Sequence, residues 1–167
     1  MIISDTSPIV SLAMINRADL LGRIYHAVLI APAVYNEIIA GVGHAGAEEV
    51  VGWDWIKVHR VSQTEVFRVL RVNLDDGEAE SIALALELAP QELLLDERKA
   101  RRMALKLDLP VAGTLDVLMA AKRAGLISTV RPVIDDLLQH AHFRVSRSLY
   151  HKLLSSANEE QASYSWS

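Results

Sequence analysis

Short apolar runs alternate along the chain with longer segments in which apolar residues recur at every third or fourth position. The runs predict buried strands, and the longer segments predict amphipathic helices. Strands are expected at residues 1–5, 28–30, 55–58, 93–95 and 110–113. Helices are expected from residue 6, over 18–24, from 32 to the glycines at 41 and 43, and over 45–51, 64–72, 78–88, 97–107, 114–124, 130–141 and 146–156. Residues 75–77 are expected to form a turn, and Thr114 is expected to cap the helix that runs to residue 124. Because strands alternate with helices, the pattern predicts an α/β fold with a mainly parallel sheet.

Composition narrows the class of protein. The chain has 167 residues, about half of them apolar, which is enough for one domain with a substantial core. It has no cysteine, so disulfides, thiolate metal sites and a cysteine nucleophile are excluded. No apolar run approaches the roughly 20 residues of a membrane-spanning helix. The start of the chain resembles no export signal, so we expect a cytoplasmic protein with no membrane partner.

Carboxylates follow the predicted strands. Asp5 ends the first strand, and Asp96 ends the strand formed by Leu93, Leu94 and Leu95. In a parallel sheet the carboxyl ends of the strands lie at one edge, where ligands bind. Glu37 and Glu78 lie near the starts of helices that begin at the same edge. Glu80 could replace Glu78, although it points to a different side of the helix.

Four carboxylates at one edge would repel one another unless a cation joined them. Oxygen ligands without cysteine suit Mg²⁺ or Mn²⁺, which can polarise a phosphodiester and activate a water for attack. The alternative is structural: Asp5 and Asp96 could be helix N-caps, and Glu78 could complement a helix dipole. A cap role does not explain Glu37, although a helix flank exposed to solvent would. A metal site needs this residue, so we expect Glu37 to distinguish the two interpretations.

At these positions the sequence resembles the PIN-domain family, in the group that includes the VapC-like toxin ribonucleases, and it is most similar to an uncharacterised PIN-like branch. The resemblance covers about residues 1–154. It rests on five segments taken in order: Ile3-Ser4-Asp5-Thr6-Ser7-Pro8, Ala31-Pro32-Ala33-Val34-Tyr35-Asn36-Glu37, Asp76-Gly77-Glu78-Ala79-Glu80-Ser81-Ile82-Ala83-Leu84-Ala85, Leu94-Leu95-Asp96-Glu97-Arg98-Lys99-Ala100-Arg101-Arg102 and Val111-Ala112-Gly113-Thr114-Leu115.

The resemblance implies a three-layer α/β/α fold over residues 1–157. Residues 158–167 are polar, and we expect them to form a frayed tail. It also implies an RNA-cleaving site that binds Mg²⁺ or Mn²⁺. Carried over by position, the metal-binding and catalytic carboxylates are Asp5, Glu37, Glu78 and Asp96, with Glu80 as the substitute for Glu78. The third acid is more often Asp in the toxins, so Glu is a departure here. Ser7 and Thr114, or Asp116 in place of Thr114, match supporting positions.

Basic residues crowd the helix that starts beside Asp96. Arg98, Lys99, Arg101 and Arg102 could bind RNA phosphates, or they could form a solvated helix face. The resemblance also implies a small antitoxin protein as a partner and a homodimer, for which the apolar helices over residues 9–24 could supply a face. The predicted function is a metal-dependent endoribonuclease and toxin. The alternatives are a non-catalytic α/β module that binds nucleic acid or protein, and a DNA-directed nuclease using the same site.

Overall fold

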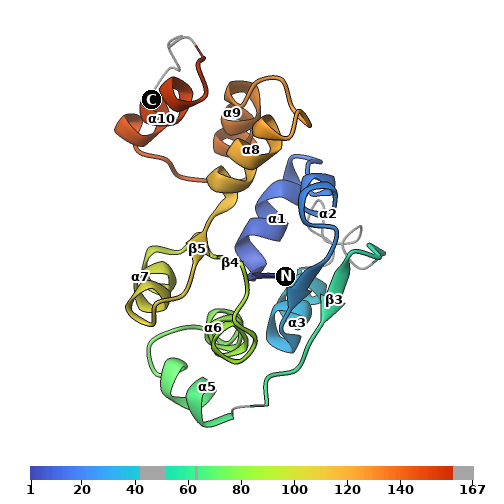
Figure 1. The fold of residues 1–167 in the computed structure, drawn as a ribbon, viewed down its shortest axis with the longest axis vertical. Helices are drawn as coiled ribbons and strands as arrows, with labels where there is room; N and C mark the ends of the chain where they lie inside the picture. Colours follow the sequence, from blue (N-terminus) through green and yellow to red (C-terminus); the bar gives the residue numbers. More distant parts are fainter. Residues whose placement is uncertain (42–51, 63, 160–167) are drawn as a thin grey trace.

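The computed structural model describes residues 1–41, 52–62 and 64–159, and it confirms the α/β class with a central parallel sheet (Figure 1). The helix expected over 45–51 and the tail beyond residue 159 lie outside the described residues. The strands are β1 (Ile2–Ser4), β2 (Val28–Ile30), β3 (Ile56–Val58), β4 (Glu92–Leu94) and β5 (Val111–Ala112). The helices are α1 (Thr6–Met14), α2 (Asp19–Tyr25), α3 (Pro32–Ala40), α5 (Thr64–Leu70), α6 (Asp76–Leu88), α7 (Arg98–Lys106), α8 (Thr114–Arg123), α9 (Arg131–His140) and α10 (Arg147–Ser156).

The five strands are ordered β3-β2-β1-β4-β5, and every neighbouring pair is parallel. From β1 the chain builds outward through β2 to β3, and then returns to add β4 and β5 on the other side. The order therefore reverses between β1 and β4, which pair Ile3 with Leu93. In open α/β sheets, a reversal of this kind leaves a crevice at the carboxyl ends of the two strands.

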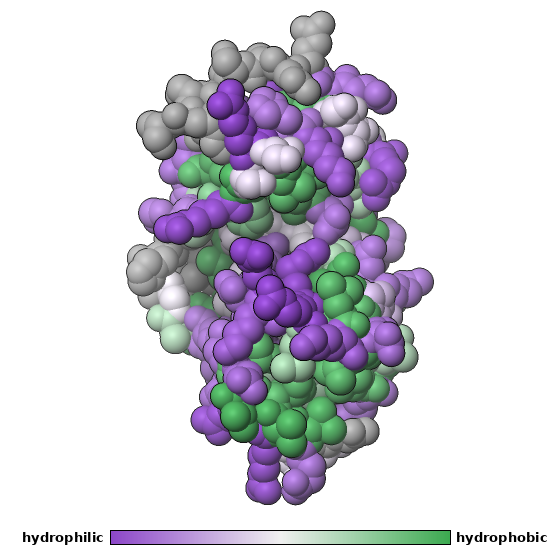
Figure 2. All heavy atoms as spheres, turned by 90° about the vertical axis from the view of Figure 1, so that its left-hand side faces the viewer, coloured by the Kyte–Doolittle hydropathy of each residue, from purple (hydrophilic) through white to green (hydrophobic). Residues whose placement is uncertain are grey.

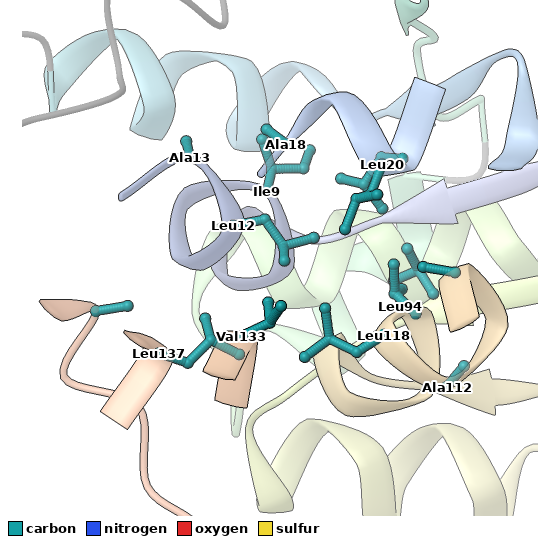
Figure 3. Packing of buried hydrophobic residues seen from close by; sticks show 14 of the residues in the cluster. Ile9, Leu12, Ala13, Ala18, Leu20, Leu94, Ala112, Leu118, Val133 and Leu137 are labelled. Carbon is teal, nitrogen blue, oxygen red and sulfur yellow. The ribbon is translucent and has the colours of Figure 1, made fainter. Parts of the chain in front are cut away.

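Alternation along the strands divides the apolar side chains between the two faces of the sheet. Ile2 and Leu94 join a cluster with α1, α2, α8 and α9, whereas Ile3 and Leu93 join one with α6 and α7. Figure 3 shows the first cluster, in which residues of α1 face those of α8 and α9. These layers match the α/β/α arrangement expected from the resemblance. The apolar stripe of α1 and α2 is mostly buried in this core.

The C-terminal helices lie at one end of the molecule, with α5 and α6 at the other (Figure 1). The buried Tyr150 of α10 donates a hydrogen bond to Oδ1 of Asp135 in α9, at 2.7 Å. Glu159 binds the start of α9, because its carboxylate accepts from the backbone N–H groups of Val130 and Arg131. Among the described residues, no helix is both long and apolar enough to cross a bilayer.

Two helix starts differ from the sequence expectation. The residues expected to form a turn before α6 are partly helical: Asp75 is the N-cap, and its side chain accepts from the backbone N–H of Glu78. Asp-x-x-Glu is a capping-box spacing, so α6 begins two residues earlier than its apolar pattern suggests. Thr114 was expected to cap α8, but the N-cap is Gly113, and the Thr114 side chain binds Asp96 instead.

Candidate functional site

Two aspartates stand at the β1–β4 reversal. Asp5 directly follows β1, and its backbone N–H donates to the carbonyl of Leu94 in β4 at 3.0 Å. Asp96 lies two residues beyond the end of β4. Since β1 and β4 are neighbouring parallel strands, both carboxylates lie at the carboxyl edge of the sheet, as the sequence predicted.

The Asp5 carboxylate is buried, with only 4 % of the residue exposed. Asp5 occupies the N-cap position of α1, but its side chain makes no capping hydrogen bond. Its Oδ1 is buried and has no hydrogen-bond partner among the described residues. Burial raises the pKa of Asp5 to about 7; the Thr6 backbone N–H acts in the opposite direction, and the charges of Asp75, Glu37 and Glu78 raise the pKa further. A cap role therefore does not account for this carboxylate.

Glu37 reaches the same region from α3. Its Oε2 accepts a short hydrogen bond from the Thr6 hydroxyl, and its Oε1 accepts from the backbone N–H of Gly77 at 3.0 Å. Gly77 is in the first turn of α6, so Glu37 caps a neighbouring helix, and the expectation that no cap role could explain Glu37 is wrong. A Cβ atom at Gly77 would lie 2.6 Å from Oε1, so the absence of a side chain there allows the contact.

Glu78 is almost fully buried in the first turn of α6. Its Oε2 accepts from the Asp75 backbone N–H at 3.2 Å, which completes the capping box. Burial raises the pKa of Glu78, and the charge of Asp75 raises it further. Glu78 therefore has a structural role in its own helix while its charge also acts on Asp5.

Glu80 binds elsewhere. Its Oε2 accepts from the backbone N–H of Ala33 at 2.7 Å, in the first turn of α3. The contact mirrors the one between Glu37 and Gly77, so α3 and α6 each supply a carboxylate to the other's N-terminus. Of the two candidates for the third acid, Glu78 is the one whose charge acts on Asp5.

Asp96 is held from the start of α8. The Thr114 backbone N–H donates to its Oδ1 at 2.8 Å, and the Thr114 hydroxyl donates to its Oδ2 at 2.6 Å. Burial raises the pKa of Asp96, against the lowering effect of these hydrogen bonds and of the Arg101 charge. A Cβ atom at Gly113 would lie 2.7 Å from Arg101 Nη1 and 2.9 Å from Asp96 Oδ1, so this glycine lets both side chains pass close to the backbone.

The predicted supporting residues differ in their surroundings. Thr114 contacts an acid directly, whereas Ser7 is exposed and makes no hydrogen bond to Asp5 in the described structure. In α1, the hydroxyl that binds an acid is that of Thr6, which donates to Glu37 of α3. Asp116 caps its own helix by accepting from the Gly113 backbone N–H at 2.8 Å. Sequence reasoning missed Thr6 and Asp75, although the Asp75-x-x-Glu78 spacing was visible as a capping signature.

Among the basic candidates, Arg101 alone is held against the site: its Nη1 donates to the Leu95 carbonyl at 2.7 Å. Arg98, Lys99 and Arg102 are exposed on α7. Arg98 and Arg101 line the same groove as Asp96, so these two residues place positive charge beside that carboxylate.

The carboxylates do not form a finished metal cage. Within the described part of the chain, no group of three histidine, aspartate or glutamate side chains is arranged to hold one ion. The donors are nevertheless all oxygens, and the Asp5 carboxylate has a buried oxygen without a partner, which suits a hard divalent cation. Binding of one ion by three of these carboxylates would therefore require the side chains to move closer together than they are here.

The protein is therefore an α/β protein with an open parallel sheet, and its acidic site lies where the strand order reverses between β1 and β4. A family model described as a PIN domain matches residues 1–159, and the chain belongs to this family. PIN domains are generally metal-dependent nucleases. No curated protein and no solved structure matches the chain significantly.

Proposed function

We propose that this PIN-domain protein is an endoribonuclease that requires Mg²⁺ or Mn²⁺ and hydrolyses RNA phosphodiesters. The observation that carries the proposal is the Asp5 carboxylate, which is buried among other acids with one oxygen unpaired. Burial of a carboxylate oxygen without a hydrogen-bond partner is costly. A cation would supply the missing partner for that oxygen.

The proposed ligands are Asp5, Glu37, Glu78 and Asp96, bound directly or through water. When bound, a divalent cation lowers the pKa of a water and stabilises the leaving oxygen of a phosphodiester. Asp5 must lose its proton before it can bind a cation, and its pKa of about 7 means that this proton is lost near neutral pH. Thr114 keeps the Asp96 carboxylate in one orientation. Arg98 and Arg101 line a groove with Asp96, and in this proposal they bind the substrate's phosphates.

The second candidate is a non-catalytic module, and specific contacts favour it. Glu37, Glu78 and Glu80 all accept hydrogen bonds from backbone N–H groups in first turns or caps of helices. These three acids would therefore be present in a protein that never binds metal. Asp5 distinguishes the two functions, because it alone of the four proposed ligands has an unpartnered buried oxygen.

The test is calorimetric titration of Mn²⁺ into the wild type, Asp5→Asn and Asp19→Asn. Asp19 is an exposed acid of α2 in a surface ion pair, so its variant controls for the loss of one negative charge. We expect saturable binding that disappears only in Asp5→Asn. Equal binding by all three folded proteins would contradict the assignment of the site.

A cleavage assay would then compare a labelled RNA with a DNA of the same sequence. We expect metal-dependent hydrolysis of the RNA alone. Hydrolysis of the DNA alone would show that the protein is a DNA-directed nuclease and not a ribonuclease. We propose further that the protein is the toxin of a toxin–antitoxin pair, that it binds a small antitoxin protein and that it forms a homodimer. Growth arrest on expression, abolished by Asp5→Asn, is the expected sign of a toxin.

A further inference from the structure

A groove of about 570 Å³ runs from Asp96 toward the C-terminal helix. Its walls come from the starts of α7 and α8, from the segment that joins α9 to α10, and from α10 itself. This volume lies within the range of about 300–1,000 Å³ typical of small-molecule sites. Of the four proposed ligands only Asp96 lines the groove, and most of its wall is made by residues that the proposed function does not use.

Arginine side chains from separate elements line this groove. Arg98 and Arg101 come from α7, and Arg144 comes from the segment before α10. Arg101 uses one N–H for the Leu95 carbonyl, so its guanidinium is held in place with donors to spare. The acidic lining residues are Asp96 and Asp116, whose carboxylates are bound by backbone N–H groups at the start of α8. In a chain with a net charge of −4, these arginines make the outer part of the groove attractive to anions.

The remaining wall is apolar. Leu115, Phe143, Val145, Leu149 and Leu153 line it, with Leu149 at 41 % exposure. Figure 2 views this side of the molecule and shows hydrophilic side chains across the face, with hydrophobic surface above and below them. A ligand that fits must therefore combine negative charge with a flat or apolar part.

We propose that this groove binds one unpaired nucleotide next to the cleaved phosphate of a single-stranded RNA. The inference rests on the proposed function and adds a specificity site to it. Arg98 and Arg144 contact the phosphates, while the base enters between α10 and the start of α8 and lies against the apolar wall. In a duplex the bases are stacked and paired, so only an unpaired base can reach a recessed wall of this kind.

Charge favours a nucleic acid over a peptide as the occupant. A peptide helix could also cover the apolar wall, but it has no general need for arginines on two sides of a groove. A phosphate-bearing strand needs these cations and also brings a flat base to the wall. The groove begins at Asp96, where the proposed reaction occurs, so a strand bound in it passes the acidic site.

The first test uses Leu149→Glu and Leu149→Gln. Leu149 is at the N3 position of α10, whose N-cap Ser146 accepts from its backbone N–H. Glu and Gln at N3 both complete a capping box, so neither change should harm folding. The readout is fluorescence anisotropy of a short labelled single-stranded RNA in EDTA, where no cleavage occurs. We expect binding by Leu149→Glu to be roughly five- to tenfold weaker than by Leu149→Gln, because only Glu repels phosphate.

The second test measures salt dependence. Arg144→Ala should make the slope of log K against log salt shallower by about 0.7, the value for one lost phosphate contact on a single strand. Arg23→Ala removes an exposed arginine on α2, away from the groove, and should leave the slope unchanged.

The outcomes separate this inference from the proposed function. If the wild type cleaves RNA but Leu149→Glu and Leu149→Gln bind RNA equally well, the groove proposal is overturned and the nuclease assignment stands. If the two variants differ in RNA affinity while the wild type neither binds Mn²⁺ nor cleaves RNA, the groove is still a nucleic-acid site and the nuclease assignment fails. Equal affinity for single-stranded and duplex RNA, or no binding of either by the wild type, overturns the groove proposal, and the latter result would favour a peptide occupant.

Discussion

At Asp5 the protein bears the free-energy cost of burying a carboxylate oxygen that has no hydrogen-bond partner. The other proposed ligands gain hydrogen bonds from neighbouring backbone or hydroxyl groups, whereas Oδ1 of Asp5 gains none. Such sites are typical of function, because selection for folding alone would favour a satisfied or apolar side chain.

This cost predicts an unusual pH dependence. The folded pKa of Asp5 is raised to about 7 from an ordinary value of 3.8, so its contribution to stability is fully present below about pH 4 and is lost as the pH rises through 7. In EDTA, the wild type should therefore lose about 3 kcal/mol relative to Asp5→Asn between pH 5 and pH 8, at about 1.36 kcal/mol per pKa unit.

The measurement is urea unfolding of both proteins at the two pH values. Glu78 and Asp96 also have raised pKa values, so the wild type alone would mix several contributions, and the difference from Asp5→Asn isolates one. A difference that does not change with pH would show that Asp5 is ionised and compensated in the metal-free protein.

Gly77 allows Glu37 to be moved without altering any acid. A methyl group there would meet the Glu37 carboxylate, so Gly77→Ala should displace it from Thr6 and from the start of α6. We expect Mn²⁺ affinity to fall about 10- to 100-fold, the usual effect of losing a group that orients a ligand. The higher helix propensity of Ala, worth about 1 kcal/mol over Gly, should offset part of the stability lost with the Glu37 contact.

The control for Gly77→Ala is Gly41→Ala at the end of α3, where φ is −80° and the nearest atoms to an added Cβ lie 3.4 Å away. Calorimetry on the three proteins is the measurement. Unchanged Mn²⁺ affinity in Gly77→Ala would mean that Glu37 does not help to bind the cation.

At the scale of elements, helix ends are satisfied by distant carboxylates as much as by local caps. Glu159 accepts from two N–H groups at the start of α9 and from the Lys122 ammonium at 2.8 Å. Partial burial raises the pKa of Glu159, but these hydrogen bonds outweigh burial and hold the pKa below its ordinary value. The end of the described chain is thereby fixed to α8 and α9.

Glu159→Gln should therefore destabilise the fold by about 1–3 kcal/mol, because charge-assisted hydrogen bonds are lost at a nearly buried group. The difference from wild type should be present above the ordinary pKa and disappear as the pH falls through the lowered folded pKa. Urea unfolding against Glu65→Gln, an exposed acid of α5, is the measurement. Equal stability of the two variants near neutral pH would show that the contact contributes nothing.

The sequence was enough to predict the helices and strands, but not which of them contact one another. Apolar runs and 3.6-residue periodicity located the strands and helices, and the parallel sheet then placed Asp5 and Asp96 at one edge. The strand order could not be derived, so the reversal between β1 and β4 was not foreseen. Nor was the capping of α6 by Glu37, because such contacts depend on which helices become neighbours. Gly113 gave no sequence signal, since its role depends on Arg101 and Asp96 approaching it from other segments.

For the whole molecule, ligand binding to the folded state alone should raise its stability. At a Mn²⁺ concentration 100-fold above Kd the gain is about 2.7 kcal/mol. For a protein of this size that corresponds to a rise in Tm of about 5–10 °C. Thermal unfolding with Mn²⁺ and with EDTA is the measurement, and Asp5→Asn should show no rise. An equal rise in wild type and variant would indicate metal binding elsewhere.

The exchange of carboxylates between α3 and α6 has a consequence for how the activity could be controlled. Glu37 and Glu80 keep these helices joined through backbone N–H groups, and neither contact involves a cation. A chelator should therefore silence the protein without unfolding it, and returning the cation should restore the activity at once. Under the proposed function, the metal-free protein is a folded, inactive reserve whose activity follows the free metal concentration.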